Sequence, residues 1–336
     1  MAQARGPRQN LVTDASRRRD DARAGETGER SMTDSVAGSA AAPKPALSPL
    51  ILACLAATWL IWGSTYLAIK WALISLPPFF QMGTRFLVAG GLLMAWMRLV
   101  RKASWPTRVE WRHAFLVGTL MLGGGMGSTA YAEQSVDSGL AVAFIAVVPI
   151  MIAAINMIWK VYPSKLEATG IAVGLAGVLM LTQGAGFRAS PQGLAAIAVA
   201  CLSWSVGSVM SQRRWTLAPG ATGFASEMLC GGCALMLMSL AAGEPAAVAS
   251  NWPFHAKAVL AWAYLVVFGS LMAFNAYMVL LARVSGGLAS SYTFVNPVIA
   301  MLLGVSLAGE VVTGYEWLSS AVILLGVILL MSRRRL

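Results

Sequence analysis

Long runs of apolar residues alternate with short polar, proline- or glycine-containing breaks along residues 48–332. An α-helix rises 1.5 Å per residue, so about 20 apolar residues cross the roughly 30 Å hydrocarbon core of a bilayer. The runs that approach this length are 50–69, 79–99, 114–132, 138–158, 166–183, 192–211, 222–242, 258–281, 286–307 and 316–332. The pattern therefore predicts an all-α polytopic membrane protein with ten transmembrane helices.

Composition supports this prediction and separates one segment from the rest. Hydrophobic residues make up 57% of the chain, charged residues 12%, and the mean hydropathy is +0.68. A soluble domain carries about 25% charged residues, so an ordinary soluble enzyme is excluded. Residues 1–47 are rich in charge, Gly, Ala and Pro, and we expect a disordered cytoplasmic tail without a signal peptide. Met32 begins a more conventional lead-in to the first span and is the start that we expect.

The basic residues between the runs predict the orientation. Counted over alternate loops, one side carries thirteen: Arg98, Arg101, Lys102, Arg108, Arg112, Lys160, Lys165, Arg213, Arg214, Arg283, Arg333, Arg334 and Arg335. The other side carries three, which are Lys70, Arg188 and Lys257. The positive-inside rule then places both termini in the cytoplasm, in a cytoplasmic (inner) membrane. Because the basic residues are scattered between apolar runs, we expect no nucleic-acid partner.

The chain also contains an internal repeat. A shift of 148 lays residues 138–149 over 286–297 with five of twelve residues identical, and a shift of 149 lays Glu167 on Glu316 and Gly177 on Gly326. We expect two units of five helices, 48–183 and 192–332. Because five is odd, the second unit enters the membrane from the opposite face. Inverted repeats of this kind build secondary transporters that bind their substrate near the midplane.

Four segments carry a resemblance to a known family. They are WGSTYLAIKWAL (62–73), RFLVAGGLL (85–93), YAEQSVDSGLAVAFIAVVP (131–149) and LLARVSGGLASSYTFVNPVIAMLLGVSLAGE (280–310). With them the chain resembles the EamA family of the drug/metabolite transporter superfamily over about 48–332, and is similar to its YedA-like drug/metabolite exporters. The resemblance implies ten helices and the export (efflux) of small metabolites or toxic compounds. In the first repeat, the Leu-Gly-Glu sequence that is frequent in the family is replaced by Trp159, Lys160 and Val161.

Two charged residues lie well inside predicted spans. A charge at the bilayer centre costs about 2.5–3.5 kcal/mol on insertion scales, so Arg85 and Glu227 are functional candidates. Their predicted depths differ by roughly 13 Å, which argues against a direct ion pair. Arg85 is a candidate to bind an anionic group of the substrate, or its side chain snorkels to the outer headgroups. Glu227 is a candidate for proton coupling, and the alternative is that it pairs with another residue at the inner interface.

Aromatic and polar residues at mid-depth predict a substrate site. These candidates are Trp62, Ser64, Thr65, Tyr66, Tyr131, Trp204, Asn275, Tyr277, Tyr292 and Asn296. Trp62 and Tyr66 are four residues apart and share a helix face. An aromatic cavity would suit flat or amphipathic solutes, and ordinary helix packing is the alternative for each residue.

Two prolines are candidates for hinges. Pro149 and Pro297 are each twelfth in their runs, about 17 Å into the hydrocarbon core. Proline removes a backbone hydrogen bond and kinks a helix. The pair could form a functional hinge or simple packing kinks.

Several apparent motifs do not indicate catalysis. The Cys230–Cys233 spacing lies inside an apolar run, and the glycines at 123–127 read as a close-packing surface. His113 and His255 are the only histidines, and no Walker motif occurs, so we expect no metal, no cofactor and no enzyme. The leading hypothesis is a secondary transporter for a small organic solute, with or without coupling to protons. The alternatives are an intramembrane lipid-handling protein or enzyme, and a pore-type channel.

Overall fold

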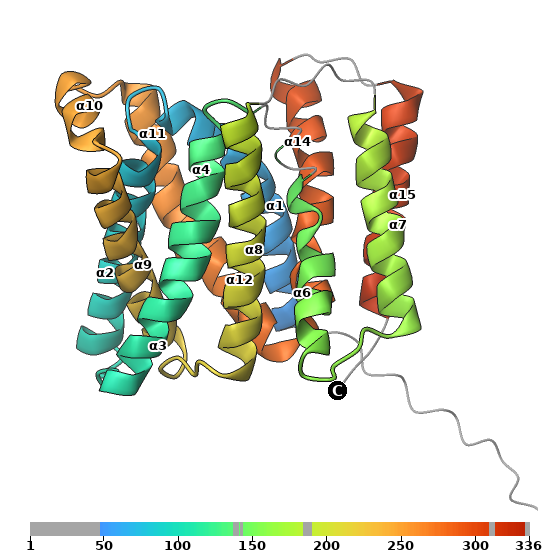
Figure 1. The fold of residues 1–336 in the computed structure, drawn as a ribbon, viewed down its shortest axis with the longest axis horizontal. Helices are drawn as coiled ribbons and strands as arrows, with labels where there is room; N and C mark the ends of the chain where they lie inside the picture. The colour runs from blue at the N-terminus through green and yellow to red at the C-terminus, as the bar shows by residue number, and fades with distance from the viewer. Residues whose placement is uncertain (1–47, 137–140, 142–143, 184–189, 309–312, 333–336) are drawn as a thin grey trace, which may run out of the picture. The chain divides into compact units, whose positions relative to one another are not determined.

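The computed structural model describes residues 48–136, 141, 144–183, 190–308 and 313–332. The regular elements of these residues are all helices (Figure 1). The longest uninterrupted ones are α1 (Pro49–Ala72), α2 (Pro78–Leu99), α7 (Lys165–Thr182), α8 (Pro191–Arg213), α9 (Ala221–Ala241), α14 (Tyr292–Ala308) and α15 (Gly314–Ser332). Shorter ones are α6 (Val148–Met157), α10 (Glu244–Ser250) and α13 (Gly286–Ala289). The predictions for 1–47 and for the loop at 184–189 lie outside the described residues.

Among the residues that the structure describes, four helices are long and apolar enough to cross a membrane by length and composition. They are α1, α8, α9 and the continuous helix 256–283. Their starts follow simple capping rules, because a hydroxyl side chain before an apolar run accepts a hydrogen bond from a free N–H of the first turn. Ser48 caps α1 in this way and Ser190 caps α8, where the Gly193 N–H donates. Thr107 and Glu110 form a reciprocal capping box at the start of α3 (Arg108–Gly118).

Two long helices widen in the middle, which the sequence did not reveal. The first consists of α3, the π-helical η1 (Thr119–Gly127) and α4 (Ser128–Ala132). The second consists of α11 (Ala256–Tyr264), the π-helical η2 (Leu265–Phe274) and α12 (Asn275–Arg283). The two π-helical segments are about 147 residues apart, close to the shift that superposes the repeat. π-Helical turns are rare and occur often at functional sites.

The fourth and ninth predicted spans need correction. The predicted helix 138–158 is interrupted by a turn at 146–147, and α6 begins at Val148, so Pro149 lies in the first turn of α6. A proline there costs no helical hydrogen bond, and the prediction of a mid-helix kink at Pro149 is wrong. Pro297 does lie inside a helix, α14. The predicted span 286–307 is divided into α13 and α14 by a turn at 290–291.

Close backbone contacts pair helices of the first half with helices of the second. At one edge of the bundle, α7 packs antiparallel to α15, and at the other edge α2 packs on α9 (Figure 1). A Cβ on Gly177 would lie 2.7 Å from the backbone nitrogen of Ile323, and a Cβ on Gly326 would lie 2.5 Å from that of Gly174. A shift of 149 residues converts the first contact into the second. The two contacts are therefore equivalent under the sequence repeat.

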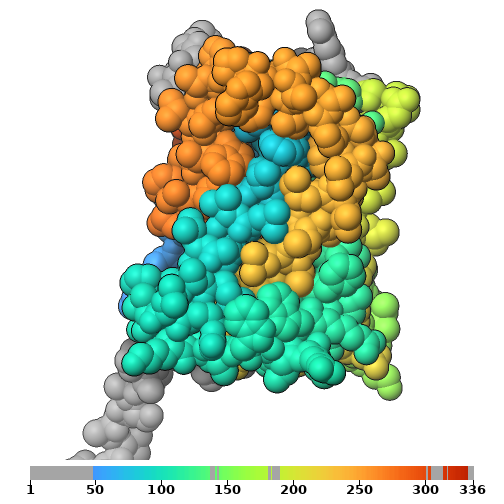
Figure 2. Space-filling view, turned by 90° about the vertical axis from the view of Figure 1, so that its left-hand side faces the viewer, coloured from blue at the N-terminus to red at the C-terminus, as the bar shows by residue number. Residues whose placement is uncertain are grey.

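The directions of the helices place the basic residues at one end. The glycine contacts run in opposite order along α2 and α9, where Gly83 meets Met236 and Gly90 meets Leu229. Figure 2 faces this edge, where α2 runs between α9 and the helix formed by α11 and η2. The end of α2, the start of α3 and the end of α8 lie together at the lower end of Figure 1. We call this the basic end, because these segments carry Arg98, Arg108 and Arg213.

The glycine contact between α7 and α15 should be required for stability. We expect Gly326→Ala to destabilise the fold by about 1–3 kcal/mol, because the added methyl meets the Gly174 backbone. Gly91→Ala is the matched control, since a Cβ there meets nothing within 4 Å and alanine favours a helix. Thermal melting of the detergent-solubilised protein measures both. Equal melting midpoints for the two variants would contradict the assignment.

Candidate functional site

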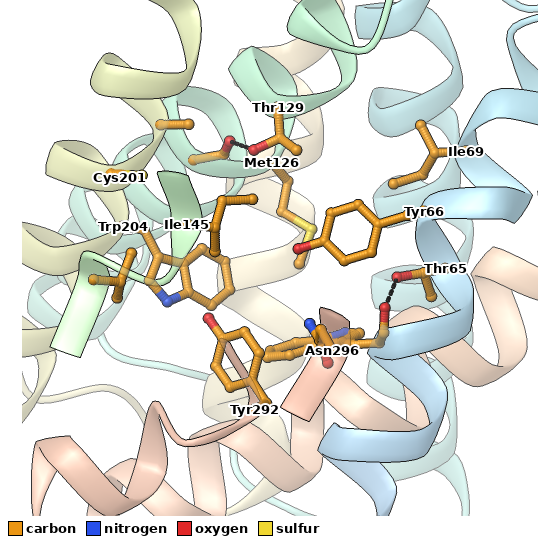
Figure 3. A pocket seen from close by; sticks show the side chains of 14 residues that line it. Thr65, Tyr66, Ile69, Met126, Thr129, Ile145, Cys201, Trp204, Tyr292 and Asn296 are labelled. Carbon is orange, nitrogen blue, oxygen red and sulfur yellow. Dashed lines mark hydrogen bonds between the residues drawn. The ribbon is translucent and has the colours of Figure 1, made fainter. Parts of the chain in front are cut away.

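A cavity lies inside the bundle, enclosed by α1, η1, α4, α6, α8 and α14 together with Ile145. Its volume is about 70 Å³. Fourteen residues line it (Figure 3). They are Trp62, Thr65, Tyr66, Ile69, Gly125, Met126, Thr129, Ile145, Val148, Ala200, Cys201, Trp204, Tyr292 and Asn296. None of these fourteen is Asp, Glu, Lys, Arg or His, so the wall is apolar and aromatic with a few hydrogen-bonding groups.

Four aromatic rings form a cluster at one end of the cavity, which we call the aromatic cluster: Trp62, Trp204, Tyr277 and Tyr292. The centroid of Trp62 lies 4.6 Å from that of Tyr292 and 5.7 Å from that of Trp204, both edge-on. Such pairs contribute about 0.5–1.5 kcal/mol each beyond their buried area. The Trp204 Nε1–H donates to the Tyr277 hydroxyl at 3.1 Å, and Trp62 Nε1–H donates to the Gly269 carbonyl at 3.3 Å. The rings are therefore held in one arrangement.

The aromatic cluster separates the cavity from the basic end. Along α1, which runs away from the basic end, Trp62 precedes Thr65 and Ile69. Along α8, which runs toward the basic end, Trp204 follows Cys201. On both helices the remaining cavity residues therefore lie on the far side of the cluster from the basic end.

Asn296 supplies an unused hydrogen-bonding group. Its side chain is fully buried, and neither atom of its amide makes a hydrogen bond within the described residues. In Figure 3 the Asn296 amide and the Tyr66 side chain both extend into the cavity. A buried polar group without a partner costs about 1–3 kcal/mol. The cavity therefore offers a donor and an acceptor that a bound solute could satisfy.

Six of the residues predicted from the sequence are brought together here. Trp62, Thr65, Tyr66, Trp204, Tyr292 and Asn296 line the cavity. Tyr277 is fully buried behind it, in the aromatic cluster, where Ser208 also lies 3.0 Å from its hydroxyl.

Three other candidates point elsewhere. The Ser64 hydroxyl pairs with the Tyr264 hydroxyl at 2.7 Å. The Tyr131 ring is 39% exposed and stacks on Phe79. The Asn275 amide nitrogen donates to the carbonyls of residues 270 and 271 within its own widened helix. None of these three residues lines the cavity.

Arg85 lies outside the cavity and is buried inside the bundle. Its side chain is 1% exposed and packs between α2 and η2. The Nε–H donates to the Ser270 hydroxyl at 2.7 Å, and the guanidinium lies 4.8 Å from the centroid of the Phe86 ring. Nη2 makes no hydrogen bond within the described residues. The structure thus gives Arg85 neither direct contact with the cavity nor the snorkelling position.

Glu227 is fully buried on α9, and both carboxylate oxygens lack a hydrogen-bond partner among the described residues. Gly90 meets Leu229 in the antiparallel α2–α9 pair. Arg85, five residues before Gly90, therefore lies opposite about residue 234 of α9. That position is seven residues, about 10 Å, from Glu227. The two charged residues accordingly make no direct contact.

The sequence pattern did not reveal the contribution of the helix formed by α3, η1 and α4 to the cavity wall. Met126 and Thr129 line the cavity, and their three-residue spacing puts them on one face. Tyr131, the residue selected on this helix, is two positions beyond Thr129 and so about 200° around the helix. The spacing in the sequence shows that Met126 and Thr129 share one helix face, but it does not show that this face is directed toward the cavity.

A carboxylate lies one turn beyond the cavity wall. Glu133 follows the last residue of α4 and is four positions after Thr129. Burial raises the pKa of its carboxyl well above the ordinary value, and the charge of Lys70 opposes this shift. Lys70 is itself four positions after Tyr66, so both charged residues lie toward the end opposite the basic end.

Known proteins share this sequence pattern and fold. The pattern of the EamA-like transporter family matches residues 47–183 and again 191–332. The chain is 41% identical over 280 residues to the uncharacterized inner membrane transporter YedA of Escherichia coli K12, covering 83% of this chain and 90% of that protein. It is 24% identical to the protein PagO of Salmonella typhimurium, covering 82% and 91%. A solved crystal structure shares the fold with a TM-score of 0.67 at 23% identity, covering 83% and 95%.

Apolar helices of membrane-spanning length around a buried cavity, together with these relatives, define a multi-pass membrane transporter. The chain belongs to the EamA-like transporter family.

The buried contact of Arg85 leads to a stability prediction. Ser270→Ala removes the acceptor of a buried, charged N–H, and we expect a loss of about 1–3 kcal/mol. Ser250→Ala is the control, because that hydroxyl is exposed and bonds only to Ala247 of its own helix. Thermal melting in detergent compares the two variants. A midpoint for Ser270→Ala equal to that of Ser250→Ala would show that the contact contributes nothing.

Proposed function

We propose that this chain is a secondary transporter that exports a small organic metabolite or drug-like solute across the cytoplasmic membrane by alternating access. The cavity between helices of both halves is the observation that carries the proposal. Its uncharged aromatic wall suits a flat or amphipathic solute. The unpaired Asn296 amide suits a neutral polar group that both donates and accepts a hydrogen bond.

The architecture behind the proposal is ten transmembrane helices in two inverted five-helix repeats, 48–183 and 192–332. Two observations support it. The family pattern matches twice along the chain, and the two π-helical segments recur at nearly the repeat spacing. The excess of basic residues on one side favours cytoplasmic termini.

The aromatic cluster is the proposed barrier between the cavity and the cytoplasm. Its centre is the contact between Trp62 of the first half and Trp204 of the second. A solute can pass from one side of the membrane to the other only if these two halves separate there. Pro297 lies next to Asn296 inside α14, and Pro149 follows the turn at 146–147 at the start of α6. Both are proposed hinges.

Glu227 is the proposed coupling residue. A carboxyl group buried among helices without a partner can bind and release a proton as the surrounding helices move. No cofactor takes part in this proposal, and the partners are the solute, the lipid bilayer and protons.

The binding role of Asn296 can be tested by transport. The purified protein in proteoliposomes is screened with a panel of metabolites, with and without a pH gradient. For a transported solute, we expect Asn296→Leu to raise the half-saturating concentration about tenfold, because a lost hydrogen bond in a buried site costs about 1.4 kcal/mol. The control is Gln134→Leu, whose exposed amide donates only to the Tyr131 carbonyl. An unchanged half-saturating concentration for Asn296→Leu would remove it from the site.

The coupling role of Glu227 is tested in the same liposomes. Glu227→Gln mimics the protonated side chain permanently, so we expect loss of the acceleration by a pH gradient while solute exchange without a gradient persists. Glu110→Gln is the control, because that carboxylate caps α3 at the exposed basic end. If Glu227→Gln responds to the gradient as the unmodified protein does, the coupling role is wrong.

A further inference from the structure

A second cavity lies at the basic end, between α6, α7, α8, α12 and α13. Its volume is about 490 Å³, which is larger than that of the first cavity, hereafter the aromatic cavity. Its polar wall contains Asn156, Glu167, Gln212 and Arg213, and none of its lining residues belongs to the aromatic cavity. The second cavity is therefore a separate site.

An apolar groove continues this cavity along the surface of the bundle. The groove offers about 420 Å³ between α6 and α7 and is lined by apolar and small residues, among them Ile150, Ala172 and Leu179. Ala153 and Pro163 line both the groove and the polar cavity. The two spaces therefore adjoin, with a polar compartment at the basic end and an apolar one along the helices.

Arg213 is held in position at the junction of α8 and α6. Its Nε–H donates to the Asn156 side-chain oxygen at 3.1 Å, and the Asn156 amide nitrogen donates to the Ile152 carbonyl at 3.0 Å. Within the described residues, the bond to Asn156 is the hydrogen bond that the Arg213 side chain makes. The other guanidinium N–H groups remain available to an anion. Glu167 also lines the cavity and has an interaction of its own.

We propose that the polar cavity and the groove together bind one membrane phospholipid of the leaflet at the basic end. Arg213 binds the phosphate, because a guanidinium forms strong, charge-assisted hydrogen bonds with phosphate oxygens. One acyl chain lies in the groove between α6 and α7, whose exposed apolar side chains face the hydrocarbon of the bilayer. This site goes beyond the proposed transport function and stands independently of it.

Two pairs of variants test the two halves of the site. Arg213→Gln removes the phosphate ligand, and Arg214→Gln removes the neighbouring charge, which does not line the cavity. Ala172→Trp fills the groove, and Thr169→Trp adds the same bulk at an exposed position outside it. The full chain is purified, incubated with phosphatidylglycerol, and the bound lipid is counted by native mass spectrometry. Inorganic phosphate at the same concentration is added in a parallel sample.

We expect Arg213→Gln and Ala172→Trp each to lower phosphatidylglycerol retention about fivefold or more, and the two control variants to retain it. Inorganic phosphate should not displace the lipid, because it lacks the chain that fills the groove. Equal losses in Arg213→Gln and Arg214→Gln would assign retention to general charge and overturn the site. Retention by Ala172→Trp, or displacement by phosphate alone, would overturn the role of the groove.

Discussion

Close approach of helix backbones is the interaction on which this bundle depends. Between lipid-exposed helices the hydrophobic effect contributes little, because lipid tails are as apolar as leucine side chains, so packing and internal hydrogen bonds hold the helices together. Gly174 and Gly326 bring α7 against α15, and Gly90 brings α2 against α9. These contacts join the two halves at the two edges of the bundle. The helices between the edges can then enclose a cavity without separating.

The polar groups of the interior fall into two sets. Most are paired, as in the bonds of Trp62 to the Gly269 carbonyl and of Trp204 to Tyr277, which keep the aromatic cluster in one arrangement. Asn296 and Glu227 are fully buried and unpaired within the described residues. An unpaired buried group lowers stability, and both residues have a role in the transport that we propose.

The two cavities divide the molecule by chemistry. The aromatic cavity is uncharged and lies beyond the aromatic cluster from the basic end. The polar cavity carries Arg213 and opens into an apolar groove. A solute and a phospholipid would thus occupy different places, although α6 and α8 border both cavities.

The sequence by itself determined the class of protein, the position of most helices and the existence of a repeat, because hydropathy reports directly on how much of the chain can lie in a bilayer. It also identified Trp62, Trp204, Tyr292 and Asn296, since large aromatic and amide groups at mid-depth are conspicuous. Only the tertiary structure decided which face of each helix looks inward. In lipid both faces of a helix are apolar, so the rotation that turned Tyr131 outward and Thr129 inward came from packing against neighbouring helices.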